Sequence, residues 1–123
     1  MKGIIAVNNL GFIGKDNKLL WRNVEDLQHF KNLTLNTTLL VGWNTYMNMP
    51  ELSNRVTILD DRNSKIDLNL IDWCIGGKRT YEKYSSHFTE LHISHINDNS
   101  IGDIQQPDWS NLNSECKIYN YHF

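Results

Sequence analysis

The hydrophobic positions of this chain fall in short apolar runs separated by polar segments. The runs at Gly3–Val7, Thr38–Val41, Arg55–Leu59 and Ile71–Ile75 each predict a strand. The first run is continuously apolar, which is typical of a strand buried on both faces of a sheet. We therefore expect a sheet at the centre of the protein.

Three of the intervening segments carry helix patterns. Val24–Leu33 follows Asn23, a good N-cap, and has acidic residues in its first turn, where the helix dipole favours negative charge. Asn44–Met49 is predicted as a short helix that stops before Pro50, and Lys78–Tyr84 as a third helix. Strands that alternate with helices indicate a mainly parallel sheet with right-handed crossovers.

Two later segments alternate between apolar and polar residues. Glu90–Ile96 and Lys117–Phe123 are therefore predicted as strands, and the terminal strands are expected to add antiparallel edges. The segments Asn8–Leu20, Asp60–Asn69 and Ile101–Trp109 are predicted as loops. The expected fold class is α/β, with a mixed, mostly parallel central sheet flanked by helices.

Composition narrows the class of protein. A chain of 123 residues predicts a single domain over residues 1–123. A net charge of -2 argues against a nucleic-acid binder, and no apolar stretch is long enough to span a membrane. Cys74 and Cys116 lack a metal-ligand spacing, and the histidines form no HxH or HxxxH pair, so we expect no metal site. A reducing cytoplasm with both thiols free is the expected setting.

Asp26 is the first candidate functional residue. Helical spacing places it on the same face as Phe30 and Leu33. A carboxylate at the apolar edge of a helix is costly unless something pairs with it, so Asp26 is capped, salt-bridged or available to a polar ligand. We interpret it as a ligand-binding group; the simpler alternative is an acidic residue placed to suit the helix dipole.

Two predicted strands end in glycine just before a helix, at Gly42–Thr45 and Gly76–Thr80. Free N–H groups at a helix N-terminus suit an anionic phosphate, and glycine lets the phosphate approach the backbone. Two such turns suggest a ligand with two phosphate regions, such as a dinucleotide. The alternative is that the glycines are ordinary turn residues.

In these and other segments the chain resembles dihydrofolate reductases. The matching segments follow the family's order and cover most of the chain: Ile4–Val7, Ile13–Trp21, Glu25–Thr34, Leu39–Tyr46, Ile75–Glu82, Ser94–Ile96 and Gly102–Asp108. The resemblance implies hydride transfer from NADPH to C6 of 7,8-dihydrofolate with a proton added at N5, giving tetrahydrofolate. It also implies that antifolates such as methotrexate or trimethoprim bind.

The resemblance implies roles for particular residues on the substrate side. Asp26 holds the 2-amino group and N3 of the pterin, Trp21 helps to order a water beside it, and Leu19 completes the catalytic group. Arg55 pairs with the α-carboxylate of the glutamate tail. The implied substrate contacts are Ile5, Ala6, Asp26, Leu27, Phe30, Lys31, Met49, Arg55, Ile75 and Ser94.

On the cofactor side the resemblance implies a pyrophosphate cradle around a cis Gly76–Gly77 peptide. The segment Asn8–Leu20 corresponds to a mobile lid, which Asp103 helps to hold shut. The implied cofactor contacts are Val7, Ile13, Gly14, Gly42, Trp43, Asn44, Thr45, Asp60, Arg62, Gly76, Gly77, Lys78, Arg79, Thr80 and Tyr81.

The chain also departs from the family pattern. It is short between Arg55 and Ile71 and again after Asp108, which shortens the adenosine side and the C-terminal part. Leu20 stands where the family often has proline. Asp60 and Asp61 precede Arg62 where the cofactor 2′-phosphate is expected, so NADH remains an alternative cofactor.

Three functions follow as alternatives. The first is an active dihydrofolate reductase, expected to be a monomer with no nucleic-acid or membrane partner. The second is a binding module that retains pterin or nucleotide binding without efficient turnover. The third is a related pterin or pyrimidine reductase, which Asp26 and Arg55 disfavour.

Overall fold

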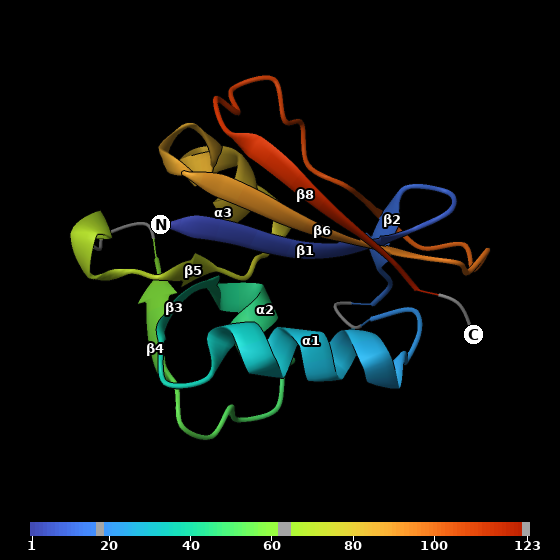
Figure 1. The fold of residues 1–123 in the computed structure, drawn as a ribbon, viewed down its shortest axis with the longest axis horizontal. Coiled ribbons are helices and arrows are strands. Elements are labelled where there is room, and N and C mark those ends of the chain that lie inside the picture. Colours follow the sequence, from blue (N-terminus) through green and yellow to red (C-terminus); the bar gives the residue numbers. More distant parts are fainter. Residues whose placement is uncertain (17–18, 62–64, 122–123) are drawn as a thin grey trace.

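A six-stranded parallel sheet forms the centre of the protein. The computed structural model describes residues 1–16, 19–61 and 65–121. The strand order is β4-β3-β5-β1-β6-β8, and every neighbouring pair in this order is parallel. Figure 1 shows helix α1 on one face of this sheet and helix α3 on the other. The expected α/β class is therefore confirmed.

The elements lie close to their predicted positions. The strands of the central sheet are β1 (Lys2–Asn8), β3 (Thr38–Gly42), β4 (Val56–Asp60), β5 (Trp73–Cys74), β6 (Glu90–Ile96) and β8 (Glu115–Tyr121). The helices are α1 (Val24–Thr34), α2 (Trp43–Met47) and α3 (Lys78–Tyr84), with 3-10 turns at η1 (Leu68–Leu70) and η2 (Ser85–His87). None of the helices in the described ranges is long and apolar enough to cross a membrane.

Successive residues of the inner strands supply two separate hydrophobic clusters. Ile4, Leu39 and Trp73 pack on one face, together with Phe30 and Leu33 of α1. Their neighbours Ile5, Leu40 and Cys74 pack on the other face with residues of α3. Side chains alternate across a strand, so a continuous apolar run fills both clusters.

The thiol of Cys74 lies in the α3-side cluster. It is fully buried, and burial raises its pKa to about 12, so it stays protonated. Cys116 is exposed and also free. Within the part of the chain that the structure describes, no group of His, Cys, Asp and Glu side chains could hold a metal ion.

The C-terminal strand corrects one prediction. We expected the terminal strands to add antiparallel edges, but β8 runs parallel to β6, with Glu90 opposite Glu115 and Ile96 opposite Tyr121. The connection at residues 97–114 is longer than the dozen residues that a parallel return needs, and it carries the chain back to the starting end of β6. The alternation of apolar residues was correct, but alternation carries no information on strand direction.

A small second sheet lies within two segments that we predicted as loops. Strand β2 (Phe12–Gly14) pairs antiparallel with β7 (Ile104–Gln105). These strands are too short to show a hydrophobic period, so sequence patterns missed both. The pairing joins the predicted lid, residues 8–20, to the loop that contains Asp103.

Replacing Leu40 tests whether the α3-side cluster stabilises the sheet. Leu40→Ala should lower the free energy of unfolding by about 2–5 kcal/mol, because this fully buried side chain would leave a cavity. Urea unfolding measures the change. Val56→Ala is the control, since Val56 lies on the next strand at 62% exposure and should change stability by less than about 0.5 kcal/mol. Equal effects of the two changes would contradict this account of the core.

Candidate active site

Asp26 lies in the first turn of α1 with its carboxyl group against the sheet. The side chain of Asn23 caps the helix by accepting a hydrogen bond from the Asp26 N–H at 3.0 Å. Asp26 is only 9% exposed, although it is ionisable. Burial raises the pKa of Asp26, while a hydrogen bond from the Ser94 side chain and then the charge of His29 lower it. A buried carboxyl group with one neutral hydrogen-bond partner retains capacity to bind a polar ligand.

Asp26 of α1 and Ser94 of β6 come together from separate segments of the chain. Ser94 is buried on β6, and its neighbour in β1 is Ala6. Trp21 is buried at 8% exposure, and its Nε1 has no hydrogen-bond partner among the residues the structure describes. A buried indole N–H usually has an acceptor, so Trp21 Nε1 is a donor suited to a polar ligand or water.

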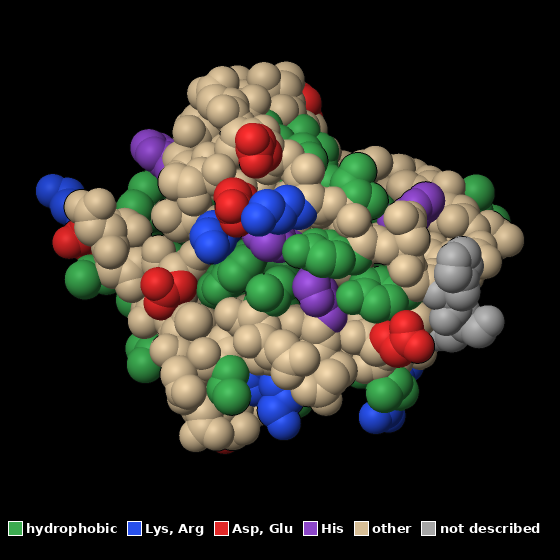
Figure 2. Space-filling model, in the orientation of Figure 1, with side chains coloured by type: hydrophobic (Ala, Val, Ile, Leu, Met, Phe, Trp, Pro, Cys, Tyr) green, Lys and Arg blue, Asp and Glu red, His purple; other side chains and the backbone are tan. Residues whose placement is uncertain are grey.

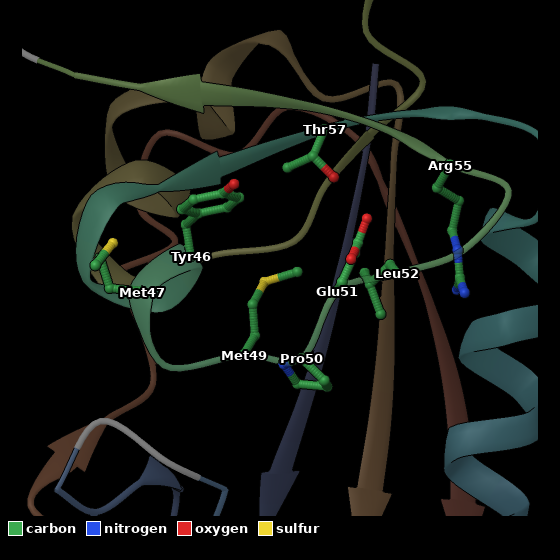
Figure 3. Close-up of a pocket in the computed structure, with 8 residues that line it drawn as sticks. All are labelled: Tyr46, Met47, Met49, Pro50, Glu51, Leu52, Arg55 and Thr57. Atoms are coloured by element: carbon green, nitrogen blue, oxygen red, sulfur yellow. The ribbon is translucent and has the colours of Figure 1, made fainter.

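A pocket of about 610 Å³ lies beside α2, and Met49 and Arg55 line it. Figure 3 shows Arg55 extending toward α1 at one side, with Tyr46 and Met47 of α2 at the other. The pocket also contains the carboxylate of Glu51. Asp26 is not among the residues that line this pocket.

Arg55 is held in place from two sides. Its Nε donates to the Ser53 carbonyl at 2.9 Å, and its Nη1 donates to Thr34 Oγ1 at 3.2 Å. Thr34 is the last residue of α1 and is fully buried. These bonds fix the guanidinium at the pocket while leaving donors for a carboxylate, since a guanidinium has five N–H groups.

The two glycine turns meet, as a single dinucleotide would require. The Gly42 N–H donates to the Gly76 carbonyl at 2.6 Å, and the Gly76–Gly77 peptide is cis. A Cβ on Gly42 would lie 2.6 Å from Thr80 Oγ1, and one on Gly77 would lie 2.7 Å from Thr45 Oγ1. The turns therefore form one cradle of backbone and hydroxyl groups without room for added side chains. That donor set suits a pyrophosphate, so these residues fit a dinucleotide cofactor.

The carboxylate of Asp60, at the end of β4, accepts hydrogen bonds from side chains of α3. Its Oδ1 accepts from Lys83 Nζ at 3.1 Å and from the Tyr84 hydroxyl at 3.0 Å. Thr80 Oγ1 lies 3.5 Å from its other oxygen. This carboxylate therefore links β4 to α3, and its charge is offset by Lys83. Arg62, the other predicted contact in this segment, lies outside the described residues.

Hydrogen bonds to the side chains of Asp103 and Asn8 hold the predicted lid, residues 8–20, in place. Asp103 Oδ2 accepts from the Asp16 N–H at 3.0 Å, and the Asp103 N–H donates to the Gly14 carbonyl at 3.0 Å. Asn8 accepts from the N–H groups of Leu10 and Phe12, at 3.1 and 3.0 Å. We did not single out Asn8 in the sequence. Its place directly after a buried strand, at the start of a glycine-containing loop, was the available signal.

The remaining predicted residues divide into buried and exposed groups. Those that are buried or half-buried are Ile5, Ala6, Val7, Ile13, Gly14, Phe30, Ile75, Lys78 and Tyr81. Tyr81 donates its hydroxyl to the Ile4 carbonyl, and its ring lies against Gly76, which accounts for its burial. The exposed residues are Leu19, Leu27, Lys31, Trp43, Asn44 and Arg79.

Comparison with known proteins identifies the family. A family model described as dihydrofolate reductase matches residues 1–120. Dihydrofolate reductase type 9 of Escherichia coli is 27% identical, with 83% of this chain and 73% of that protein covered. The dihydrofolate reductase of Buchnera aphidicola subsp. Schizaphis graminum is 28% identical, with 98% and 84% covered.

A solved structure agrees with these relatives. Dihydrofolate reductase from Enterococcus faecalis, complexed with NADP(H) and RAB-propyl, superposes with a TM-score of 0.74 at 25% identity. The match covers 89% of this chain and 77% of that one. Fold, site and family model agree, and this chain belongs to the dihydrofolate reductase family of NADPH-dependent oxidoreductases.

Proposed function

We propose that this chain reduces 7,8-dihydrofolate to tetrahydrofolate, with the pterin bound at Asp26 and the glutamate tail bound at Arg55. The observation that carries the proposal is the buried Asp26 carboxyl group, to which the Ser94 side chain donates a hydrogen bond. When bound, NADPH supplies the hydride that adds to C6. The chain's own residues bind and orient the substrate, and they position the water that delivers the proton to N5.

Asp26 has two tasks in this proposal. Its carboxylate accepts hydrogen bonds from the 2-amino group and N3 of the pterin, which fixes the face that C6 presents to the cofactor. Burial raises the pKa of Asp26, so the group gains a proton more readily than an exposed aspartate. We propose that the proton reaches N5 through water rather than directly from Asp26, and that Trp21 Nε1 orients that water.

The pocket beside α2 takes the rest of the substrate. Met49 and Leu52 contact the benzoyl ring, and Arg55 binds the α-carboxylate. Arg55 therefore fixes the position of the α-carboxylate in this pocket.

The glycine cradle holds the cofactor pyrophosphate. Backbone N–H groups at the start of α2 and α3, with Thr45 and Thr80, donate to the phosphates. Because Lys83 and Tyr84 bind Asp60, that carboxylate is directed to α3 rather than to the 2′-phosphate. Asp60 therefore repels the 2′-phosphate of NADPH less than the sequence alone suggests.

The proposal extends to the setting of the enzyme. We propose that it acts as a monomer in the cytoplasm, since both sites are built from residues of one chain and both cysteines are free. Sedimentation at micromolar concentration tests the first point, and a dimer would contradict it.

Asp26→Asn tests the central residue. The variant should lose at least about tenfold in kcat/KM for dihydrofolate, because the amide can neither carry the proton nor accept both pterin hydrogen bonds. Cofactor absorbance follows the reaction. Glu25→Gln is the control, since Glu25 is the exposed acidic neighbour in the same turn. Full activity in Asp26→Asn would rule out the role we assign to Asp26.

Gly77→Ala tests the cradle. The added methyl group would crowd Thr45 Oγ1, so cofactor affinity should fall about ten- to a hundredfold. Quenching of protein fluorescence by added NADPH measures this affinity. Ser86→Ala, an exposed change just beyond α3, should leave it unchanged. Loss of dihydrofolate binding to the same degree would show general damage instead.

Arg55→Gln tests the tail-binding site. KM for dihydrofolate should rise about ten- to a hundredfold, the value of one or two charge-assisted hydrogen bonds. Dihydropteroate, which lacks the glutamate tail, should be reduced at an unchanged rate. An equal loss with both substrates would mean that Arg55 acts by holding α1 through Thr34.

A further inference from the structure

His29 lies one turn along α1 from Asp26, where the helix meets the edge of the sheet. Its ring centroid is 4.1 Å from that of Tyr119 and 6.1 Å from that of Tyr121, both on β8. Figure 2 shows histidine and hydrophobic side chains side by side along this strip of the surface. The C-terminal strand thus packs its tyrosines against His29.

The His29 ring is half-buried, and its polar edge points inward. Nε2 is buried without a hydrogen-bond partner among the described residues. Residues three apart on a helix are neighbours on its surface, so the ring lies next to the Asp26 carboxyl group. A charge on either group therefore acts on the other through a partly dehydrated space.

The electrostatics of the two groups are reciprocal. Burial lowers the pKa of His29, the charge of Asp26 raises it, and the charge of His92 lowers it. For Asp26, burial raises the pKa, and the charge of His29 is among the effects that lower it. The charge of each group therefore acts on the titration of the other, which is the condition for coupled titration.

The other ionisable groups near His29 include His92 of β6 and Tyr121 of β8. His92 on β6 contacts the Tyr119 hydroxyl at 3.1 Å and Glu90 at 2.9 Å. Burial raises the pKa of Tyr121, and the charges of Asp26 and Glu25 raise it further, so its phenol is neutral near pH 7. Asp26 and His29 are the two groups on this face of α1 whose pKa values approach each other.

We propose that His29 is a positioning residue that sets the protonation of Asp26. Protonated His29 favours the Asp26 carboxylate, and neutral His29 lets Asp26 take a proton more easily. The β8 tyrosines hold the imidazole in place for this role. The proposal rests on the function proposed above, because it assigns Asp26 the pterin site.

Titration of the ligand-free protein tests the coupling without requiring turnover. In His29→Gln the carboxyl titration of Asp26, followed by ¹³C NMR, should move up by about 0.5–1 pH unit. In Asp26→Asn the imidazole titration of His29 should move down by the same amount, because coupling between two sites is reciprocal. His87→Gln, which changes an exposed histidine of η2, should move neither.

The pH dependence of kcat/KM gives a second measurement. His29→Gln should shift the midpoint assigned to Asp26 upward, and His29→Lys, which keeps a positive charge, should bring it back. His29→Tyr keeps an aromatic ring without the charge and should behave like His29→Gln. A lower rate with an unmoved midpoint would mean that His29 serves packing alone and would overturn the proposal.

Failure of this proposal and failure of the proposed function can be told apart. Unmoved titrations in an enzyme that reduces dihydrofolate would reject the role of His29 only. Shifted titrations in a protein without turnover would support the coupling and reject the function.

Discussion

The burial of one carboxyl group against the sheet is the constraint on which the site depends. Asp26 reaches that position because Asn23 caps α1 and thereby fixes where the helix begins. Without that cap the first turn would fray, and the backbone that directs the Asp26 side chain toward Ser94 would not be fixed. Burial raises the pKa of this group, and the pterin that we propose as its ligand would offset the free energy of desolvation by supplying hydrogen bonds. The same feature that costs stability in the free protein thus favours ligand binding.

The parallel sheet places the second half of the site. The carboxyl ends of β3 and β5 lie next to each other, so the turns that follow them meet at one edge. The bond from Gly42 to the Gly76 carbonyl joins these turns, and the neighbouring threonine hydroxyls leave no room for added side chains. The phosphate site that we propose at this edge would follow from strand direction and from residues without side chains, rather than from a cluster of basic groups.

The edge strand β8 has a part in the site that its sequence does not reveal. It lies parallel to β6 and places Tyr119 over His29. The chain between these strands also forms β7, which holds the lid through β2, and supplies Asp103. One connection therefore joins the predicted lid, residues 8–20, to the strand that carries Tyr119 and Tyr121.

The sequence by itself determined the local elements and much of the chemistry. Helical spacing placed Asp26 on the apolar face of α1, Asn23 was readable as its cap, and glycine after two strands predicted the cradle. Resemblance to dihydrofolate reductases added the roles of Ser94, Arg55 and Asp103, whose own neighbours in the chain say nothing of a ligand. These features were accessible because they depend on residues close together in sequence or on short motifs in a fixed order.

Only the tertiary structure decided the rest. The direction of β8, the pairing of β2 with β7 and the bond between the two glycine turns join residues far apart in the chain, and alternation or glycine content cannot specify such pairings. The binding of Asp60 by Lys83 and Tyr84 likewise depends on α3 folding back onto β4. The contact of His29 with Tyr119 requires the last strand to lie beside the first helix. Periodicity describes which face of an element is buried, whereas long-range contacts decide which charges lie together there.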